Sequence, residues 1–162
     1  MPIRVGAELY GHAGVECDIE LICLMHATLE AAAVPEIHHV LGHVGIFRAL
    51  VDAAGIESAT EAALFDAVQR KAFDEIEALL ADSVADQPLR ALLNKLTQLS
   101  GDENVLDEAL AAFADAPKAV RAPLQELAQI AAGVRARVPG IRLCFDLCEL
   151  RGYQYHTGVV FA

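Results

Sequence analysis

The densest group of side chains able to bind a ligand lies near the end of the chain, between two predicted strands. It contains Arg151, Tyr153, Tyr155 and His156, with glycines at either end that let the backbone approach a ligand closely. Arginine pairs with carboxylate or phosphate through two parallel N–H groups, and tyrosine and histidine orient a polar head group. Glu8, in a predicted first strand, could hold an amino group. These residues indicate a small polar or anionic ligand, although an ordinary hairpin with amphipathic aromatic side chains has the same composition.

A second group consists of histidines, with His38, His39 and His43 close together in the sequence. Adjacent residues of a strand point to opposite faces, so His38 and His39 cannot both ligate one metal ion without distortion. We therefore expect no metal site. The sequence also lacks a Ser-His-Asp arrangement, a phosphate-cradling glycine loop and an HExxH motif, so we expect neither a catalytic residue nor a cofactor.

The cysteines and the apolar stretches bear on where the protein works. Cys17, Cys23, Cys144 and Cys148 do not have the short spacings of structural zinc sites, and we find no signal peptide before them. Free cysteines are commonly buried, so we expect reduced thiols in a cytoplasmic protein. Charged residues interrupt the most apolar stretches well before the ~20 residues that span a bilayer, which argues against a membrane protein.

Strands on both sides must position the ligand-binding group. Residues 141–147 alternate between apolar and polar and predict a strand with one polar face, and residues 159–162 predict a second, apolar strand. In an antiparallel hairpin, Arg151, Tyr153 and Tyr155 would share one face and His156 would lie on the other. Further strands are predicted over 3–10 and 36–42, and helices over 17–33, 44–54 (ending at Gly55) and 119–138.

Residues 55–116 have a different character from the rest of the chain. Their pattern predicts short amphipathic helices over 60–72, 73–80, 88–99 and 103–113. This stretch holds 13 acidic and 4 basic residues, a net charge of −9, within a chain whose formal net charge is −11. A solvated helix face explains such an excess. We therefore divide the chain into a core, residues 1–54 and 117–162, and an acidic helical insertion, residues 55–116, and we expect no nucleic-acid partner.

Two stretches of the chain resemble class II synthetases of the histidyl type. Glu8-Leu9-Tyr10-Gly11 and the following residues 17–22 are similar to the end of motif 2 and its helix, and residues 150–161 look like the histidine-binding signature. The form Arg-Gly-Tyr-x-Tyr-His-Thr-Gly, with the runs at 6–9 and 41–48, is closer to a paralogous family, the regulatory subunits of ATP phosphoribosyltransferase. The resemblance covers essentially the whole chain, including the insertion.

This resemblance implies an α+β fold, the class II aminoacyl-tRNA synthetase-like antiparallel sheet with flanking helices and a helical insertion. It implies a non-catalytic regulatory subunit that forms a homodimer and assembles with the short catalytic phosphoribosyltransferase subunit. In this assembly the regulatory subunit makes the first step of histidine biosynthesis sensitive to histidine. The alternative is a catalytic-core fragment of a histidyl-tRNA synthetase. The negative charge of the insertion argues against this alternative, because that charge would repel the phosphates of tRNA.

The resemblance also implies which residues would bind L-histidine. By position, Glu8 would contact its α-amino group and Arg151 its carboxylate, while Tyr155 and His156 lie where the family's imidazole-contacting side chains lie. Chains of this family are considerably longer than 162 residues, so we expect this chain to be a fragment of such a protein.

Overall fold

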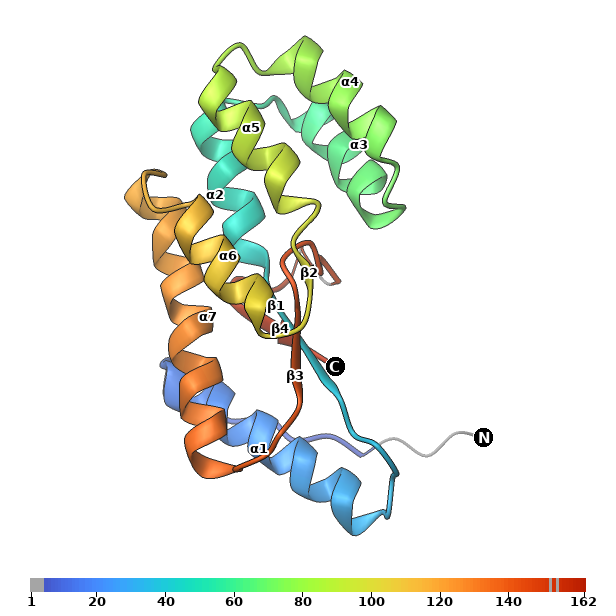
Figure 1. The fold of residues 1–162 in the computed structure, drawn as a ribbon, viewed down its shortest axis with the longest axis vertical. Helices are drawn as coiled ribbons and strands as arrows, with labels where there is room; N and C mark the ends of the chain where they lie inside the picture. The colour runs from blue at the N-terminus through green and yellow to red at the C-terminus, as the bar shows by residue number, and fades with distance from the viewer. Residues whose placement is uncertain (1–4, 152, 154) are drawn as a thin grey trace.

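The structure is a computed structural model, which describes residues 5–151, 153 and 155–162 (Figure 1). Its helices are α1 (Val15–Ala31), α2 (Val44–Ala54), α3 (Ser58–Gln69), α4 (Phe73–Ser83), α5 (Gln87–Leu96), α6 (Asn104–Ala112) and α7 (Lys118–Arg137). Its strands are β1 (His39–His43), β2 (Ser100–Gly101), β3 (Leu143–Asp146) and β4 (Val159–Phe161). No helix in the described part of the chain is both long and apolar enough to cross a membrane.

The sheet has the strand order β2-β3-β1-β4, so β1 lies between two strands from the end of the chain. β1 runs parallel to β3, with Leu41 opposite Phe145, and antiparallel to β4, with Leu41 opposite Phe161. β2 pairs antiparallel with β3. The parallel ladder is possible because a long helical crossover joins β1 to β3. The α+β prediction is confirmed, and the sheet is mixed rather than antiparallel throughout.

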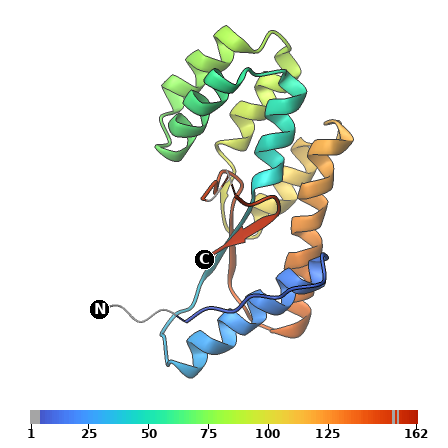
Figure 2. The ribbon, with the colours of Figure 1, turned by 180° about the vertical axis from the view of Figure 1, so that it is seen from behind.

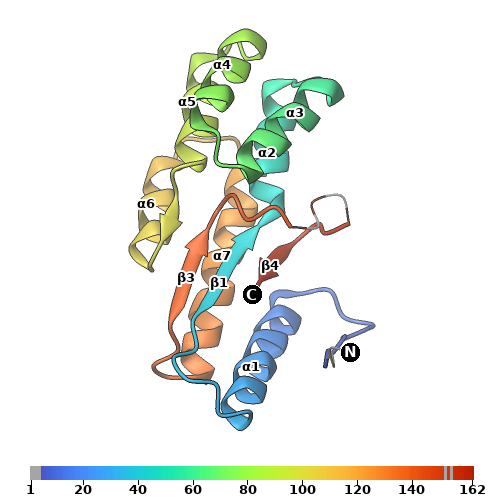
Figure 3. The ribbon, with the colours of Figure 1, turned by 90° about the vertical axis from the view of Figure 1, so that its right-hand side faces the viewer.

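Helices α1 and α7 cover one face of the sheet (Figure 3). Leu41 of β1 and Phe145 of β3 are buried, whereas the alternate residues Val40 and Cys144 are only half-buried, as the period of a strand with one covered face requires. Each buried side chain of this size contributes about 1.5–3 kcal/mol through the hydrophobic effect. This apolar layer holds the strands, and therefore the segment that joins β3 to β4, against the helices.

Helices α3, α4 and α5 of the insertion lie at the end of the molecule opposite α1, whereas α6 lies beside α7 and β2 joins the sheet (Figures 1 and 2). The four helices predicted between residues 60 and 113 are confirmed as α3 to α6, with shifted ends. Asp86 caps α5 by accepting a hydrogen bond from the Leu89 amide at 3.1 Å, and Gly55 ends α2 with φ of 64°, as predicted. The sequence did not reveal β2, a two-residue strand between the third and fourth predicted helices of the insertion. The boundaries drawn at 55 and 116 stay a prediction.

The predicted strand over residues 3–10 is wrong where the structure describes it, and its first two residues lie outside the described residues. Residues 5–10 are irregular, and Val5 and Tyr10 are more than four-fifths exposed. A strand needs a neighbour to satisfy its backbone groups, and no ladder of the described sheet includes this segment. The alternating pattern of these residues is therefore not sufficient to form a strand.

The predicted hairpin of the last two strands is also wrong. β3 and β4 do not pair with each other, because β1 lies between them. The chain from residue 147 to residue 158 leaves β3, crosses the end of β1 and reaches β4 on its far side; we call it the binding segment. Because the segment turns repeatedly instead of continuing two strands, alternation no longer decides which of its side chains share a face.

Candidate functional site

The binding segment and β4 line an open cavity of about 310 Å³. It is lined by Glu149, Arg151 and His156 from the segment and by the three residues of β4, Val159–Phe161. The structure therefore brings together Arg151 and His156, two of the four predicted histidine-binding residues. A guanidinium and an imidazole above an apolar wall can bind a small molecule that is polar at one end and flat or apolar at the other.

The other two predicted residues do not line this cavity. Tyr155 belongs to the same segment, but it is 87% exposed to solvent. Glu8 is also exposed, in the irregular segment before α1, where its carboxylate accepts a hydrogen bond from the phenol of Tyr10. The role of Glu8, Arg151, Tyr155 and His156 in binding histidine thus stays a prediction, with Arg151 and His156 placed most favourably for it.

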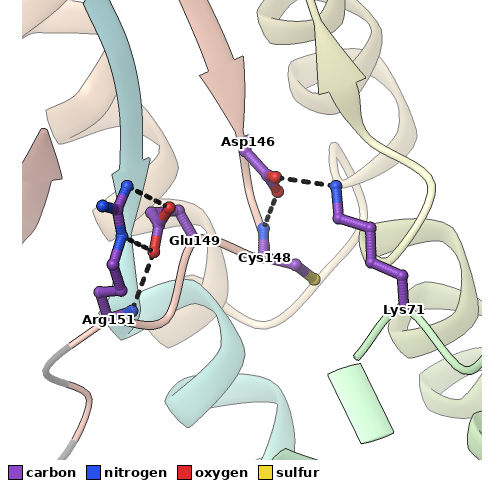
Figure 4. A network of polar contacts seen from close by, with 5 residues as sticks. All are labelled: Lys71, Asp146, Cys148, Glu149 and Arg151. Carbon is purple, nitrogen blue, oxygen red and sulfur yellow. Dashed lines mark hydrogen bonds and ion pairs between the residues drawn. The ribbon is translucent and has the colours of Figure 1, made fainter. Parts of the chain in front are cut away.

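Glu149 is a residue of the cavity that the sequence analysis missed. Its carboxylate accepts hydrogen bonds from Nε and Nη2 of Arg151 at 2.9 and 2.8 Å and from the Arg151 amide at 3.0 Å (Figure 4). The hydrogen bond from Arg151 holds the pKa of the Glu149 carboxyl below its usual range, and the same contact raises the pKa of Arg151. The pair therefore carries both charges, and the Glu-x-Arg spacing was the signal that could have revealed it.

A close approach of two backbones places Glu149. A Cβ atom on Gly42 of β1 would lie 2.6 Å from the Asp146 carbonyl oxygen and 2.8 Å from Cβ of Glu149. Only glycine at position 42 therefore lets the chain after β3 pass over β1 at this distance. The side chain of Asp146 then accepts a hydrogen bond from the Cys148 amide at 3.0 Å, which fixes the first turn of the binding segment.

Cys148 lies beside this site but is poorly suited to be a nucleophile. Burial raises the pKa of its thiol, and the charge of Asp146 raises it further (Figure 4). The thiolate is the reactive form of cysteine, so this thiol stays protonated and inert near neutral pH. Cys17, Cys23, Cys144 and Cys148 are all free thiols in the structure, and each is half-buried.

Tyr153 occupies the opposite kind of environment from the exposed Tyr155. It is 8% exposed, packs against the rings of Phe47 and Phe65, and donates a hydrogen bond to Glu61 Oε1 at 2.8 Å. Burial and this hydrogen bond raise the pKa of Tyr153 to about 12. The expectation that Tyr153 and Tyr155 share a face is wrong, because Tyr153 anchors the segment in the core while Tyr155 points to solvent.

The histidines of β1 are buried under α1 and α7. His43 Nδ1 accepts a hydrogen bond from the Gly45 amide at 3.0 Å and so caps α2, while its Nε2 lies 3.8 Å from Glu126. His39 is fully buried and His38 is exposed, which agrees with their expected opposite directions. Among the described residues, no three or more histidine, cysteine or acidic side chains are grouped as metal ligands would be.

Comparison with protein families and curated sequences places this chain among known proteins. The family model described as "Histidyl-tRNA synthetase" matches residues 1–162. A protein of Ectopseudomonas mendocina is 56% identical over 161 residues, and one of Alkalilimnicola ehrlichii is 53% identical over 161 residues. Both are named "ATP phosphoribosyltransferase regulatory subunit"; each match covers 99% of this chain and 40% of the relative.

Solved structures show the same fold. A Bacillus halodurans protein, titled as an ATP phosphoribosyltransferase regulatory subunit/histidyl-tRNA synthetase, matches with a TM-score of 0.76 and 25% identity, over 93% of this chain and 39% of that one. A chain from Thermotoga maritima, in a structure titled as an ATP phosphoribosyl transferase complex, matches with a TM-score of 0.71 and 16% identity, over 93% of this chain and 51% of that one. The expected synthetase-like fold is confirmed.

Proposed function

The chain belongs to the histidyl-tRNA synthetase family, and within it we propose that this protein is a regulatory subunit of ATP phosphoribosyltransferase. One observation carries this proposal: identity of 52–56% over nearly the whole chain to curated relatives of that name. The chain spans about 40% of the length of these relatives, so the activity of the whole protein is part of the proposal.

In this role the protein works in the cytoplasm, assembles with the short catalytic subunit, and makes the first step of histidine biosynthesis respond to histidine. It performs no aminoacylation itself. The chemistry around the cavity supports a binding role: the carboxylate of Glu149 is held by Arg151, and the nearby Cys148 thiol is kept protonated by burial. Neither group has the free base or thiolate that covalent catalysis uses.

We also propose that the cavity is where L-histidine binds. Arg151 keeps its Nη1 outside the pair with Glu149, and a guanidinium edge of this kind can receive a carboxylate. His156 lines the same cavity, and we propose that it contacts the imidazole of the bound histidine. Tyr155 and Glu8 are exposed in the structure, and in this proposal their side chains also contact the bound histidine. Histidine can regulate the assembly only if it binds one quaternary state more tightly than another.

The second candidate function is that of a histidyl-tRNA synthetase core, because the matching family model carries that description. The charge of the insertion weighs against it. Residues 55–116 hold 13 acidic and 4 basic residues, and a surface of this sign repels the phosphates of tRNA.

A homodimer of the regulatory subunit is the assembly that we propose for this protein.

A mixing experiment tests the proposal. The intact protein is combined with a short catalytic phosphoribosyltransferase subunit, and co-elution and turnover are measured with and without histidine. We expect a joint complex, faster turnover, and inhibition by histidine. Separate elution with unchanged turnover would contradict the regulatory role, and ATP–pyrophosphate exchange that depends on histidine would support the synthetase instead.

A further inference from the structure

Several contacts join the insertion to the chain around the binding segment. Tyr153 of the segment donates its hydrogen bond to Glu61 in the first turn of α3. Lys71, between α3 and α4, lies 3.2 Å from the carboxylate of Asp146 at the start of the segment (Figure 4). The Leu147 amide donates to the carbonyl of Leu99, just before β2, at 3.1 Å. The segment that carries Arg151 and His156 is thus held by a part of the chain far away in sequence.

Of the two side-chain contacts, the one between Tyr153 and Glu61 is better shielded from water than the ion pair between Lys71 and Asp146. The phenol ring of Tyr153 lies between Phe47 of α2 and Phe65 of α3, with ring centroids 5.5 and 5.2 Å away. The exposed ion pair of Lys71 contributes little by comparison, because water and salt screen it. The position of Tyr153 therefore depends chiefly on α2 and α3.

Arg48 of α2 extends this anchor to the cavity. Its Nη2 donates hydrogen bonds to the carbonyl oxygens of Tyr153 at 2.6 Å and His156 at 3.3 Å. Its guanidinium carbon also lies 4.8 Å from the centroid of the Tyr153 ring. One side chain thus joins the buried tyrosine to the backbone of His156, which lines the cavity. A displacement of Tyr153 must therefore change the position of His156 or break these bonds.

We propose that Glu61 and Tyr153 are positioning residues that join α3 of the insertion to the binding segment, so that a displacement of α3 alters the cavity lined by Arg151 and His156. The expected effect on histidine binding rests on the proposed function, which supplies histidine as the ligand and the catalytic subunit as the partner. The contact between Glu61 and Tyr153 is independent of that function. The free energy of the Glu61–Tyr153 contact is part of the coupling between α3 and the cavity.

Hydrogen–deuterium exchange of the intact protein tests the contact. Loss of this part-buried hydrogen bond in Glu61→Ala or Tyr153→Phe raises exchange of residues 147–158 by about two- to tenfold. Glu61→Gln keeps an oxygen that can accept the phenol hydrogen, so its exchange stays close to that of the unaltered protein. Asp74→Ala is the matched control, because it removes an exposed acidic residue from the first turn of α4 instead of α3.

Equal exchange of residues 147–158 in Glu61→Ala, Asp74→Ala and the unaltered protein would overturn the proposal. Faster exchange spread equally over α1 and β1 would overturn it too, because the residues would then serve only general stability. Since this measurement needs neither histidine nor a partner, its result is independent of whether the regulatory role is correct.

Histidine inhibition of the assembled complex tests the coupling. We expect the histidine concentration for half-inhibition to change by about two- to tenfold in Glu61→Ala and Tyr153→Phe, and to be restored in Glu61→Gln. Asp74→Ala should leave it unchanged. The coupling would be overturned if Glu61→Ala raises the exchange of residues 147–158 but has the same histidine concentration for half-inhibition as Asp74→Ala. Failure of the unaltered protein to assemble with the catalytic subunit would contradict the proposed function and not the positioning role.

Discussion

The imidazoles of His26 on α1 and His39 on β1 share a hydrogen bond, with 2.9 Å between Nδ1 of His26 and Nε2 of His39. The other nitrogen of His39, Nδ1, is buried and has no hydrogen-bond partner among the described residues. An unpartnered N–H group at this place would be costly, so His39 carries its hydrogen on Nε2 and donates it to His26. The pair joins α1 to the sheet with His39 in its neutral form.

Acid should therefore destabilise the protein through His39. Burial, and the neighbouring His26, lower the pKa of His39 from its ordinary 6.5, so the unfolded chain binds this proton at a higher pH than the folded one. Stability is full above the ordinary pKa and falls as the pH drops below it, with a slope of up to about 1.4 kcal/mol per pH unit for one proton. Urea unfolding between pH 7.5 and pH 5 measures this slope, which we expect to shrink in His39→Gln.

His38→Gln is the control for that variant, because His38 is the exposed neighbour of His39. Its slope should match that of the unaltered protein. The same slope in His39→Gln would contradict the assignment and leave His43, whose pKa is also lowered by burial against the opposing effect of Glu126, as the source of the acid sensitivity.

Gly42→Ala should destabilise the protein and disturb the cavity together. The added Cβ would meet the backbone oxygen of Asp146 at 2.6 Å, and a backbone atom cannot rotate away as a side chain can. Overpacking of this kind costs about 1–3 kcal/mol. Urea unfolding measures the loss. Gly6→Ala, where no heavy atom lies within 4 Å of the added Cβ, should change stability by less than about 0.5 kcal/mol, and an equal loss in both variants would refute the close approach.

Arg151→Ala should weaken binding of histidine by about tenfold or more, because hydrogen bonds to a charged group contribute about 1.5–3 kcal/mol. Isothermal titration of the intact protein measures the affinity. Arg142→Ala removes another exposed arginine outside this cavity and should leave the affinity unchanged. Equal affinities for all three proteins would remove Arg151 from the histidine site.

Cys148 should react more slowly with iodoacetamide than Cys17 in the folded protein at pH 8. Burial raises the pKa of the Cys148 thiol, and each unit of that rise lowers the thiolate fraction about tenfold. Mass spectrometry of peptides after timed labelling measures both rates. In denaturant the two cysteines should react alike; a persistent difference there would assign the slow reaction to local sequence instead of burial.

The helices show how far local pattern carries a prediction. α2 ends at Gly55 as its sequence indicates, and the four helices of the insertion lie within a few residues of their predicted places. Amphipathic period and capping residues suffice there, because the hydrogen bonds of a helix lie within a single segment. Arg151 and His156 were identified in the same way, from residue types close together in sequence.

The strands show where local pattern ends. Residues 5–10 alternate as a strand does and yet remain irregular, while β2 has only two residues and forms because β3 lies beside it. Strand pairing joins residues far apart in sequence, so no window of sequence contains the partner. The same reason explains the false hairpin, since β1 comes from residues 39–43 and lies between the two last strands.

The sequence by itself determined the helices, the acidity of the insertion and the group around Arg151, because periodicity, caps and charge are properties of contiguous residues. The α+β class came from the resemblance to the synthetase family. Only the tertiary structure decided that Tyr153 is an anchor and Tyr155 is exposed, that Glu149 holds Arg151, and that Glu61 of the insertion reaches the binding segment. These relationships depend on which elements pack together, and burial and hydrogen bonding between distant segments are settled when the chain folds.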